Sequence, residues 1–176
     1  MPVILLFNVI LVSSVSAGEI LERVEKSIAS SFGNEIEIKV EKFQIPDNVK
    51  KLIEHKVKQR FFRDYVYLYR IIKNDSVIAY AILDNVIGKV MPITFMVYFD
   101  NNGKITKSEI IKYREQYGGA VVNPEWNKQF IGKDSKSDFV VGKNIDGISG
   151  ATISVHSVTK GICKLTLLIS EIILNV

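Results

Sequence analysis

The strongest constraint on the fold is a stripe of apolar side chains in the C-terminal segment from Thr152 to Leu174. The stripe recurs at steps of three and four residues: Val155, Val158, Ile162, Leu165, Ile169 and Ile172. This spacing predicts one long α-helix with a continuous core-facing side, and it puts His156, Lys160 and Lys164 on another face. Because packing of the apolar side anchors such a helix, its first residue is held rigidly.

A turn with two glycines immediately precedes this helix. Its sequence is Asp146-Gly147-Ile148-Ser149-Gly150-Ala151-Thr152. The unpaired backbone N–H groups at a helix start and the positive end of the helix dipole together favour a phosphate group. Thr152 adds a hydroxyl at the same place. The turn is therefore interpreted either as a phosphate-binding loop or as a site where a phosphate ester is attached.

Other interpretations of the turn fit the residues less well. It lacks the Gly-Lys-Ser/Thr of a nucleotide-binding loop, and Gly147 and Gly150 have the wrong spacing for a dinucleotide fingerprint. A nucleophile elbow would need Gly-x-Ser-x-Gly, whereas Ser149 directly precedes Gly150. His156 could act as a base for Thr152, but no carboxylate is placed to orient its imidazole. The remaining alternative is a plain turn that begins a helix.

The residues before this turn predict an α+β fold. Helical patterns occur at Glu19–Phe32, about Asn48–Phe61 and, as a short element, Pro124–Phe130. Strand patterns occur at Glu35–Phe43, Tyr65–Lys73, Ser76–Val86, Ile93–Phe99 and Ile105–Tyr113. Hairpin turns are expected at Asn74-Asp75 and at Asp100 to Gly103. We expect a single domain with an antiparallel sheet, packed helices and the long C-terminal helix.

The N-terminus has the pattern of an export signal. Val3 to Val15 is almost wholly apolar, and Val15-Ser16-Ala17 offers a cleavage site before Gly18. A retained membrane anchor is the alternative for residues 1–17, although the stretch is shorter than the roughly 20 residues that span a bilayer. Both interpretations place the domain outside the cytoplasm, in the periplasm or on the extracytoplasmic face of the membrane. Residues 18–64 then form a helix–strand–helix extension.

Charge and composition exclude several classes of partner. The 176 residues carry 23 basic and 19 acidic side chains, for a net charge of +4. The basic residues are densest between Lys50 and Arg63, where the pattern is that of a solvated helix face, and no nucleic-acid-binding motif accompanies them. Cys163 is the single cysteine and there are two histidines, so neither a disulfide nor a metal site is expected.

Residues 146–152 resemble the flavinylation signature of the FMN-binding domain family. This family includes flavin-carrying components of the sodium-pumping NADH:quinone reductase and of the Rnf electron-transport complex. The resemblance implies that Thr152 carries FMN through a phosphoester bond. It also implies that Asp146 belongs to the element read by a separate flavin transferase, which uses FAD as its flavin donor.

Several upstream segments extend the resemblance back to about Tyr65, so that residues 65–176 are identified as the FMN-binding domain. They are Ile78 to Ala81, Gly88-Lys89, Pro92-Ile93, Asp100 to Ile105, Tyr113 to Glu115, and the aromatic stretch with Trp126, Phe130, Gly132 and Lys133. The sequence departs from the family pattern at Met91, where a glycine is common, and at Tyr113, where a histidine is common.

The resemblance suggests which residues surround the cofactor. Ser149, Gly150 and neighbouring amides would stabilise the phosphate, while Gly147, Gly150 and Ala151 leave room beside the backbone. The apolar candidates for the isoalloxazine are Met91, Pro92, Tyr117 and Trp126.

The implied function is that of an exported electron carrier that is not an enzyme on its own, with membrane or extracytoplasmic redox proteins as partners. A module that binds FMN non-covalently, or another phosphorylated ligand, is the alternative.

Overall fold

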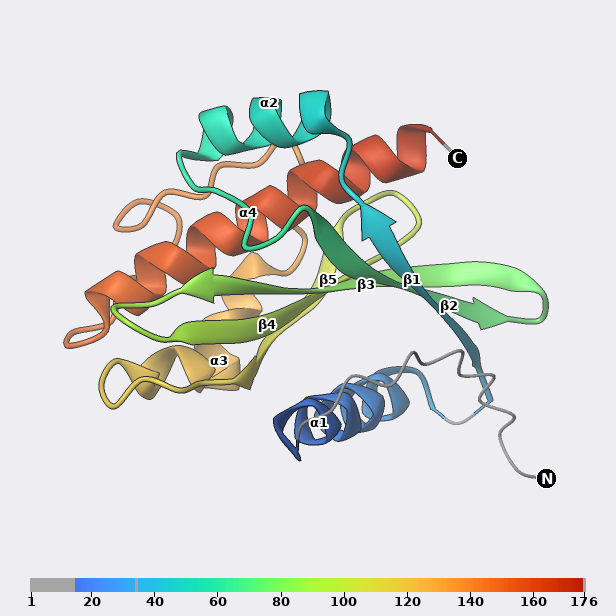
Figure 1. Cartoon of the computed structure of the whole chain (residues 1–176), viewed down its shortest axis with the longest axis horizontal. Helices are drawn as coiled ribbons and strands as arrows, with labels where there is room; N and C mark the ends of the chain where they lie inside the picture. Colours follow the sequence, from blue (N-terminus) through green and yellow to red (C-terminus); the bar gives the residue numbers. More distant parts are fainter. Residues whose placement is uncertain (1–14, 34, 176) are drawn as a thin grey trace.

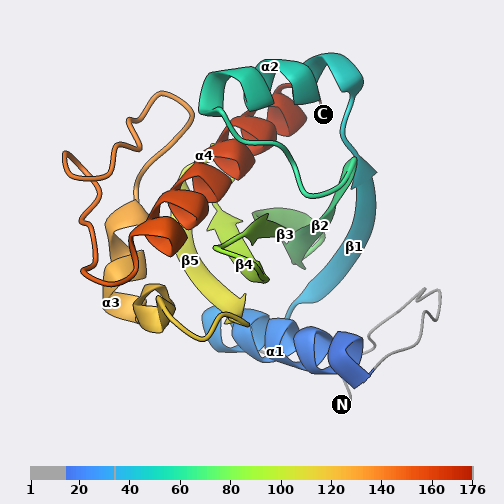
Figure 2. The same ribbon diagram turned by 60° about the vertical axis from the view of Figure 1, so that its left-hand side comes forward.

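A five-stranded antiparallel sheet forms the centre of the computed structural model, which describes residues 15–33 and 35–175. The strands follow one another in chain order, and helices cover both faces of the sheet (Figures 1 and 2). The elements are α1 (Val15–Phe32), β1 (Glu37–Gln44), α2 (Asp47–Val57), β2 (Tyr65–Lys73), β3 (Ser76–Ile87), β4 (Pro92–Phe99), β5 (Ile105–Lys112), η1 (Gly119–Val122), α3 (Pro124–Asn127), η2 (Lys128–Phe130) and α4 (Thr152–Leu174). The expected single α+β domain is confirmed.

The sheet separates two apolar cores, and β4 contributes to both because it lies between β3 and β5 and is buried on each side. Its residues Ile93, Phe95, Val97 and Phe99 face the core beneath α4, whereas Met96 and Tyr98 face the core beneath α1. The β2–β3 hairpin turns at Asn74 and Asp75, whose φ angles of 50° and 59° suit a two-residue turn between twisted strands. The predicted hairpin is confirmed.

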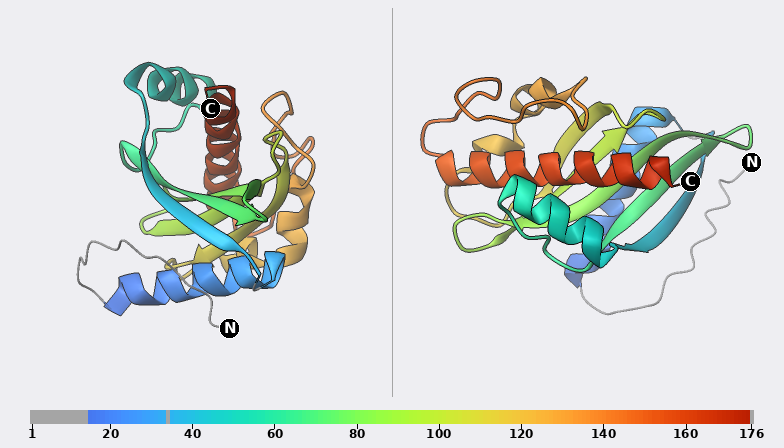
Figure 3. Two further views of the ribbon diagram at one scale, coloured as in Figure 1. Left: turned by 90° about the vertical axis from the view of Figure 1, so that its right-hand side faces the viewer. Right: turned by 90° about the horizontal axis from the view of Figure 1, so that it is seen from above.

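Helix α4 begins at Thr152 and ends at Leu174, as its periodicity predicted, and it crosses the length of the sheet (Figure 3). The six stripe residues, Val155, Val158, Ile162, Leu165, Ile169 and Ile172, are all buried. Gly161 faces the sheet closely, and an added Cβ there would come within 2.7 Å of Val86 and 2.8 Å of Phe95. Because glycine has no side chain, α4 can pack closely against β3 and β4 at this position.

Two details of the sequence prediction are wrong. Helix α2 ends at Val57 and does not reach Phe61, because Lys58 adopts a left-handed φ of 54° and the chain then turns to bury the Phe61 ring. The helical spacing predicts Lys164 on a different face from the apolar stripe, yet its side chain is fully buried. Lys164 Nζ donates to the carbonyl of Arg60 over 2.7 Å and lies over the Phe61 ring, so it joins α4 to the segment after α2.

Lys164 shares the core with a second buried charge, Asp84 on β3. The two groups lie 3.9 Å apart, and Asp84 Oδ2 accepts no hydrogen bond among the described residues. Burial raises the pKa of Asp84 to about 6, although nearby Lys164 acts in the opposite direction. Burial also lowers the pKa of Lys164. Both shifts reflect the cost of holding a charge away from water.

The raised pKa of Asp84 predicts a pH dependence of stability. Between about pH 4 and pH 6 the folded chain keeps a proton on Asp84 that the unfolded chain loses. The contribution of this group to the free energy of unfolding is therefore full at about pH 4 and is lost as the pH rises to about 6, a change of roughly 2–3 kcal/mol. Urea unfolding of the wild-type chain and of Asp84→Asn at several pH values measures it. The stability of the wild type relative to the variant should fall across this interval, and a pH-independent difference would contradict the assignment.

The predicted extension, residues 18–64, is continuous with the remainder of the fold. Strand β1 pairs with β2 along its length, from Glu37 opposite Ile72 to Gln44 opposite Tyr65. Helix α2 packs on α4, and α1 covers the opposite face of the sheet (Figures 2 and 3). The segment thus adds an edge strand and two covering helices to the same layers as the rest of the domain.

The predicted hydrophobic segment at the N-terminus falls on residues 1–14, outside the described residues, except for its last residue. Helix α1 begins at Val15, so the predicted cleavage point after Ala17 lies in its first turn. The described contacts between α1 and the sheet begin at Glu19, which pairs with Lys112 of β5. Within residues 15–33 and 35–175, every helix is too short or too polar to cross a bilayer.

Candidate functional site

Thr152 is the first residue of α4, and its side chain is exposed to solvent. The turn before it is closed by a hydrogen bond from the Ala151 N–H to the Ile148 carbonyl, 3.0 Å long. Ala151 occupies the position that precedes the helix, and no side chain caps the helix start. The first N–H groups of a long helix are therefore available to an anion beside the Thr152 hydroxyl.

The glycines of the turn leave open space next to Thr152. Gly150 has a φ of +77°, a conformation that residues with a side chain rarely adopt, and no atom would lie within 4 Å of a Cβ built there. Around Gly147 the nearest atom to such a Cβ is a methyl group of Val141 at 4.0 Å. Ser149 and Asp146 are exposed, whereas Ala151 is buried against the core. The buried Ala151 fixes the turn, and the exposed residues leave one side free for a large substituent.

The α3–η2 segment holds Asp146 by its backbone. Trp126 Nε1 donates to the Asp146 carbonyl over 2.8 Å, and the Asp146 N–H donates to Gln129 Oε1 over 2.7 Å. The Trp126 ring is only 8% exposed and packs edge-on against Phe130. Both polar groups of the Asp146 peptide backbone are thus used, while its carboxylate remains exposed at the surface.

A second contact joins the first turn of α4 to the loop after β5. The Tyr113 hydroxyl lies 2.8 Å from Ser154 Oγ and donates to the Tyr117 carbonyl. Gly118, with a φ of +81°, lies against the same groups, and an added Cβ would come within 2.8 Å of the Tyr113 hydroxyl and 2.9 Å of Ser154 Oγ. Tyr113 therefore serves as a polar link between this loop and α4.

The turn between β3 and β4 lies at the same end of the molecule as the start of α4 (Figures 1 and 3). The Glu115 carboxylate organises it by accepting the N–H groups of Val90 and Met91, at 2.6 and 2.9 Å. These hydrogen bonds lower the pKa of Glu115. An added Cβ at Gly88 would lie 2.7 Å from this carboxylate, so the approach depends on the absence of a side chain. These hydrogen bonds tie the β3–β4 turn to the loop after β5.

The four apolar candidates for an isoalloxazine neighbour differ in how accessible they are. Tyr117 is 77% exposed and Met91 is 43% exposed. Pro92 is half-buried, and its carbonyl accepts a hydrogen bond from Arg114. Trp126 is buried, so its face is committed to the core and its N–H to Asp146. Tyr117 and Met91 are thus the candidates whose side chains a ring bound at this end of the molecule can reach.

These features together form an accessible anion site beside a free hydroxyl. The exposed hydroxyl, the uncapped helix and the open space at Gly150 are all at one point of the surface. Sequence reasoning missed Gln129 and the hydrogen bonds of Tyr113, because neither follows from spacing along the chain. His156 is exposed on α4. Within the described part of the chain, no group of His, Cys, Asp and Glu side chains could hold a metal ion.

Part of the chain, including the turn before α4, is similar to known proteins. Residues 88–165 match the family model described as the FMN-binding domain. Over 70 residues the chain is 40% identical to a component protein of the Na⁺-translocating ferredoxin:NAD⁺ oxidoreductase complex of Acetobacterium woodii. This alignment covers 35% of the chain and 34% of that protein, so the chain spans about a third of the relative that it matches. The resemblance recognised from the signature is confirmed over residues 88–165, and the quoted segments before Gly88 lie outside the matched region.

Proposed function

We propose that this protein is a flavoprotein that carries FMN on Thr152 through a phosphoester bond and passes electrons between redox proteins. The observation that supports this most is the position of Thr152, an exposed hydroxyl at the uncapped start of a 23-residue helix within the region that matches the FMN-binding domain. The flavin would supply the redox chemistry. The chain would fix its position and leave it accessible to partners.

Each part of the site has a role in this proposal. The first N–H groups of α4 would bind the phosphate, and Gly150 would give it room. The buried stripe of α4 would keep Thr152 in place, because the helix cannot move without disturbing the core. The exposed Asp146 carboxylate, held through its backbone by Trp126 and Gln129, would be presented to the flavin transferase that attaches the group.

The cellular setting is part of the proposal. The apolar stretch Val3–Val15 and the small residues before Gly18 favour export, or anchoring to the membrane, with the domain on the extracytoplasmic side. A covalent bond is useful there, since a dissociated cofactor would be lost from the cell. The partners would be membrane or extracytoplasmic redox proteins, and without them the chain would not act as an enzyme.

A redox titration tests the carrier role. Chain produced together with a flavin transferase should keep its yellow colour after denaturation. In the refolded or natively prepared protein, the flavin absorbance should be lost on reduction and recovered on reoxidation. A flavin that is released by denaturant would favour the alternative, a module that binds FMN or another phosphorylated ligand without a covalent bond. A flavin that cannot be reversibly reduced would exclude the carrier role.

A further inference from the structure

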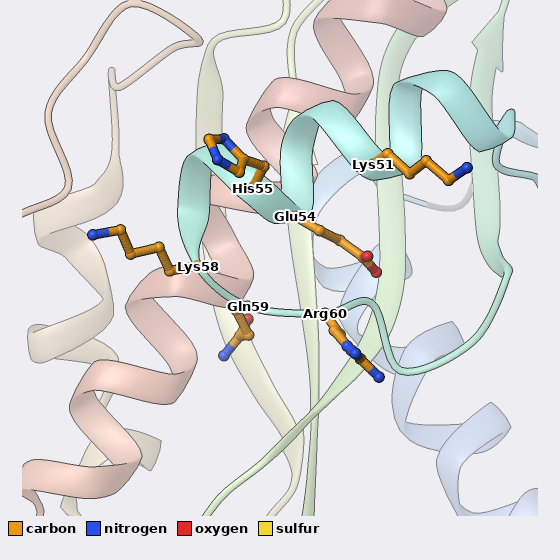
Figure 4. Close-up of a pocket in the computed structure, with 6 residues that line it drawn as sticks. All are labelled: Lys51, Glu54, His55, Lys58, Gln59 and Arg60. Carbon is orange, nitrogen blue, oxygen red and sulfur yellow. The ribbon is translucent and has the colours of Figure 1, made fainter.

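Positive charge is concentrated in one short part of this chain. Between Lys50 and Arg63 there are six basic side chains and one acidic side chain, Glu54, while the whole chain has a net charge of +4. The residues outside this segment therefore carry no net positive charge. The segment comprises most of α2 and the chain that follows it. Figure 4 shows Lys51 extending from α2, Lys58 pointing the opposite way from just after the helix, and Arg60 on the segment that follows.

Most of these charges have no partner within the described structure. Lys50 pairs with Asp64, and the Glu54 carboxylate accepts the Phe61 N–H over 2.7 Å. Five basic side chains are exposed and form no ion pair within residues 15–33 and 35–175: Lys51, Lys56, Lys58, Arg60 and Arg63. We call Lys51, His55, Lys56, Lys58 and Arg60 the basic face. Four of them, Lys51, His55, Lys58 and Arg60, line an open hollow together with Glu54 and Gln59.

The basic face lies beside the first half of α4. Gln59 Nε2 donates to the Ser157 carbonyl over 3.1 Å, and Ser157 is five residues after Thr152. At the rise of an α-helix this separation is roughly 8 Å along the axis. A protein bound to the basic face would therefore lie along the flank of whatever group Thr152 carries.

The structure disfavours a lipid bilayer as the occupant of this face. The apolar side of α2, with Ile53 buried and Val49 and Val57 packed against the core, is already used inside the molecule. Leu52, 64% exposed, is the large apolar side chain that α2 presents outward, and a single leucine is not the continuous stripe of a membrane-surface helix. Moreover α1, which follows the apolar N-terminal segment, lies on the opposite face of the sheet (Figure 3).

We propose that the basic face is the docking surface for an acidic protein that exchanges electrons with the group on Thr152. Its unpaired positive charges around one exposed leucine match an acidic surface with a small apolar centre. The identity of the docked protein as a redox partner rests on the proposed function, but the docking itself does not. Charge complementarity of this kind chiefly raises the association rate and makes binding sensitive to salt.

Binding to two c-type cytochromes of opposite surface charge tests the proposal. The chain with Thr152→Ala is used, so that docking is measured without any covalent flavin. The acidic cytochrome should bind at low salt, and affinity should fall about tenfold or more on raising the salt or in Lys58→Glu/Arg60→Glu. The matched control, Lys73→Glu/Lys104→Glu, has the same net charge and alters exposed lysines beside the β2–β3 and β4–β5 turns, at the other end of the sheet. It should change the affinity less than about twofold, because these lysines lie away from the basic face.

Three outcomes would overturn the proposal. Equal losses in the two double variants would mean that net charge, and not this face, governs binding. Equal affinity for the acidic and the basic cytochrome would remove the electrostatic basis. Lys58→Glu/Arg60→Glu could abolish binding to phosphatidylglycerol vesicles, while the control variant does not, and leave binding of the cytochrome unchanged. That result would assign the face to a membrane. Urea unfolding of each variant should give the wild-type free energy, since the altered side chains are exposed.

Discussion

Replacing Thr152 by alanine is expected to abolish the covalent attachment of FMN while leaving the fold intact. The substitution removes the hydroxyl that would form the ester. The residue is exposed at the first position of α4, so the methyl group that is also lost contributes little to packing. The free energy of unfolding should therefore change by less than about 0.5 kcal/mol. Intact-mass measurement of chain produced with a flavin transferase, after denaturation, gives the fraction of molecules that carry the flavin.

Two matched variants make the result specific. Thr152→Ser keeps a hydroxyl at the same position and should retain part of the modification. Ser149→Ala removes the neighbouring hydroxyl of the turn and should leave the attachment on Thr152. If Thr152→Ala still carried flavin and Ser149→Ala did not, the tether would be the serine and the assignment of the phosphate site would be wrong.

Replacing Gly161 by leucine is expected to give the largest loss of stability. A Cβ at this position would lie within 2.7 Å of Val86 and 2.8 Å of Phe95, both buried in the sheet, so α4 would have to move outward. Overpacking of this kind costs about 1–3 kcal/mol, and the displaced helix would also open the core on either side. Gly161→Ala already introduces the clash and should destabilise the chain, although alanine normally stabilises a helix by about 1 kcal/mol relative to glycine.

Urea unfolding measures this effect, with His156→Leu as the control. His156 is exposed on the same helix, so a leucine there does not meet the sheet. A free energy of unfolding for Gly161→Leu within about 0.5 kcal/mol of the wild type would contradict the close packing of α4 on β3 and β4. Flavin attachment should fall in parallel with the loss of stability, because the position of Thr152 depends on the anchoring of α4.

The features that the sequence predicted well are those with a local cause. The limits of α4 follow from a stripe of six residues and from the glycine turn before it. The β2–β3 hairpin follows from Asn74-Asp75, which tolerate positive φ angles. Strand limits came within a residue or two for the same reason, since alternation and turn residues act over short distances.

The features that the sequence could not predict depend on contacts between distant segments. Lys164 has the spacing of an exposed helix residue, and its burial is explained only by Asp84 on β3 and the Arg60 carbonyl. The support of Asp146 by Gln129 likewise requires knowing that the α3–η2 segment packs beneath the signature. The early end of α2 reflects the burial of Phe61, a tertiary effect that outweighs helical periodicity.

The central claim is that Thr152 holds the flavin covalently, and peptide mapping by tandem mass spectrometry tests it most directly. The wild-type chain, produced with a flavin transferase and digested with trypsin after denaturation, should yield a peptide from Asn144 to Lys160 with one FMN, less water, on Thr152. The same peptide found only in unmodified form, or FMN located on another residue, would contradict the account.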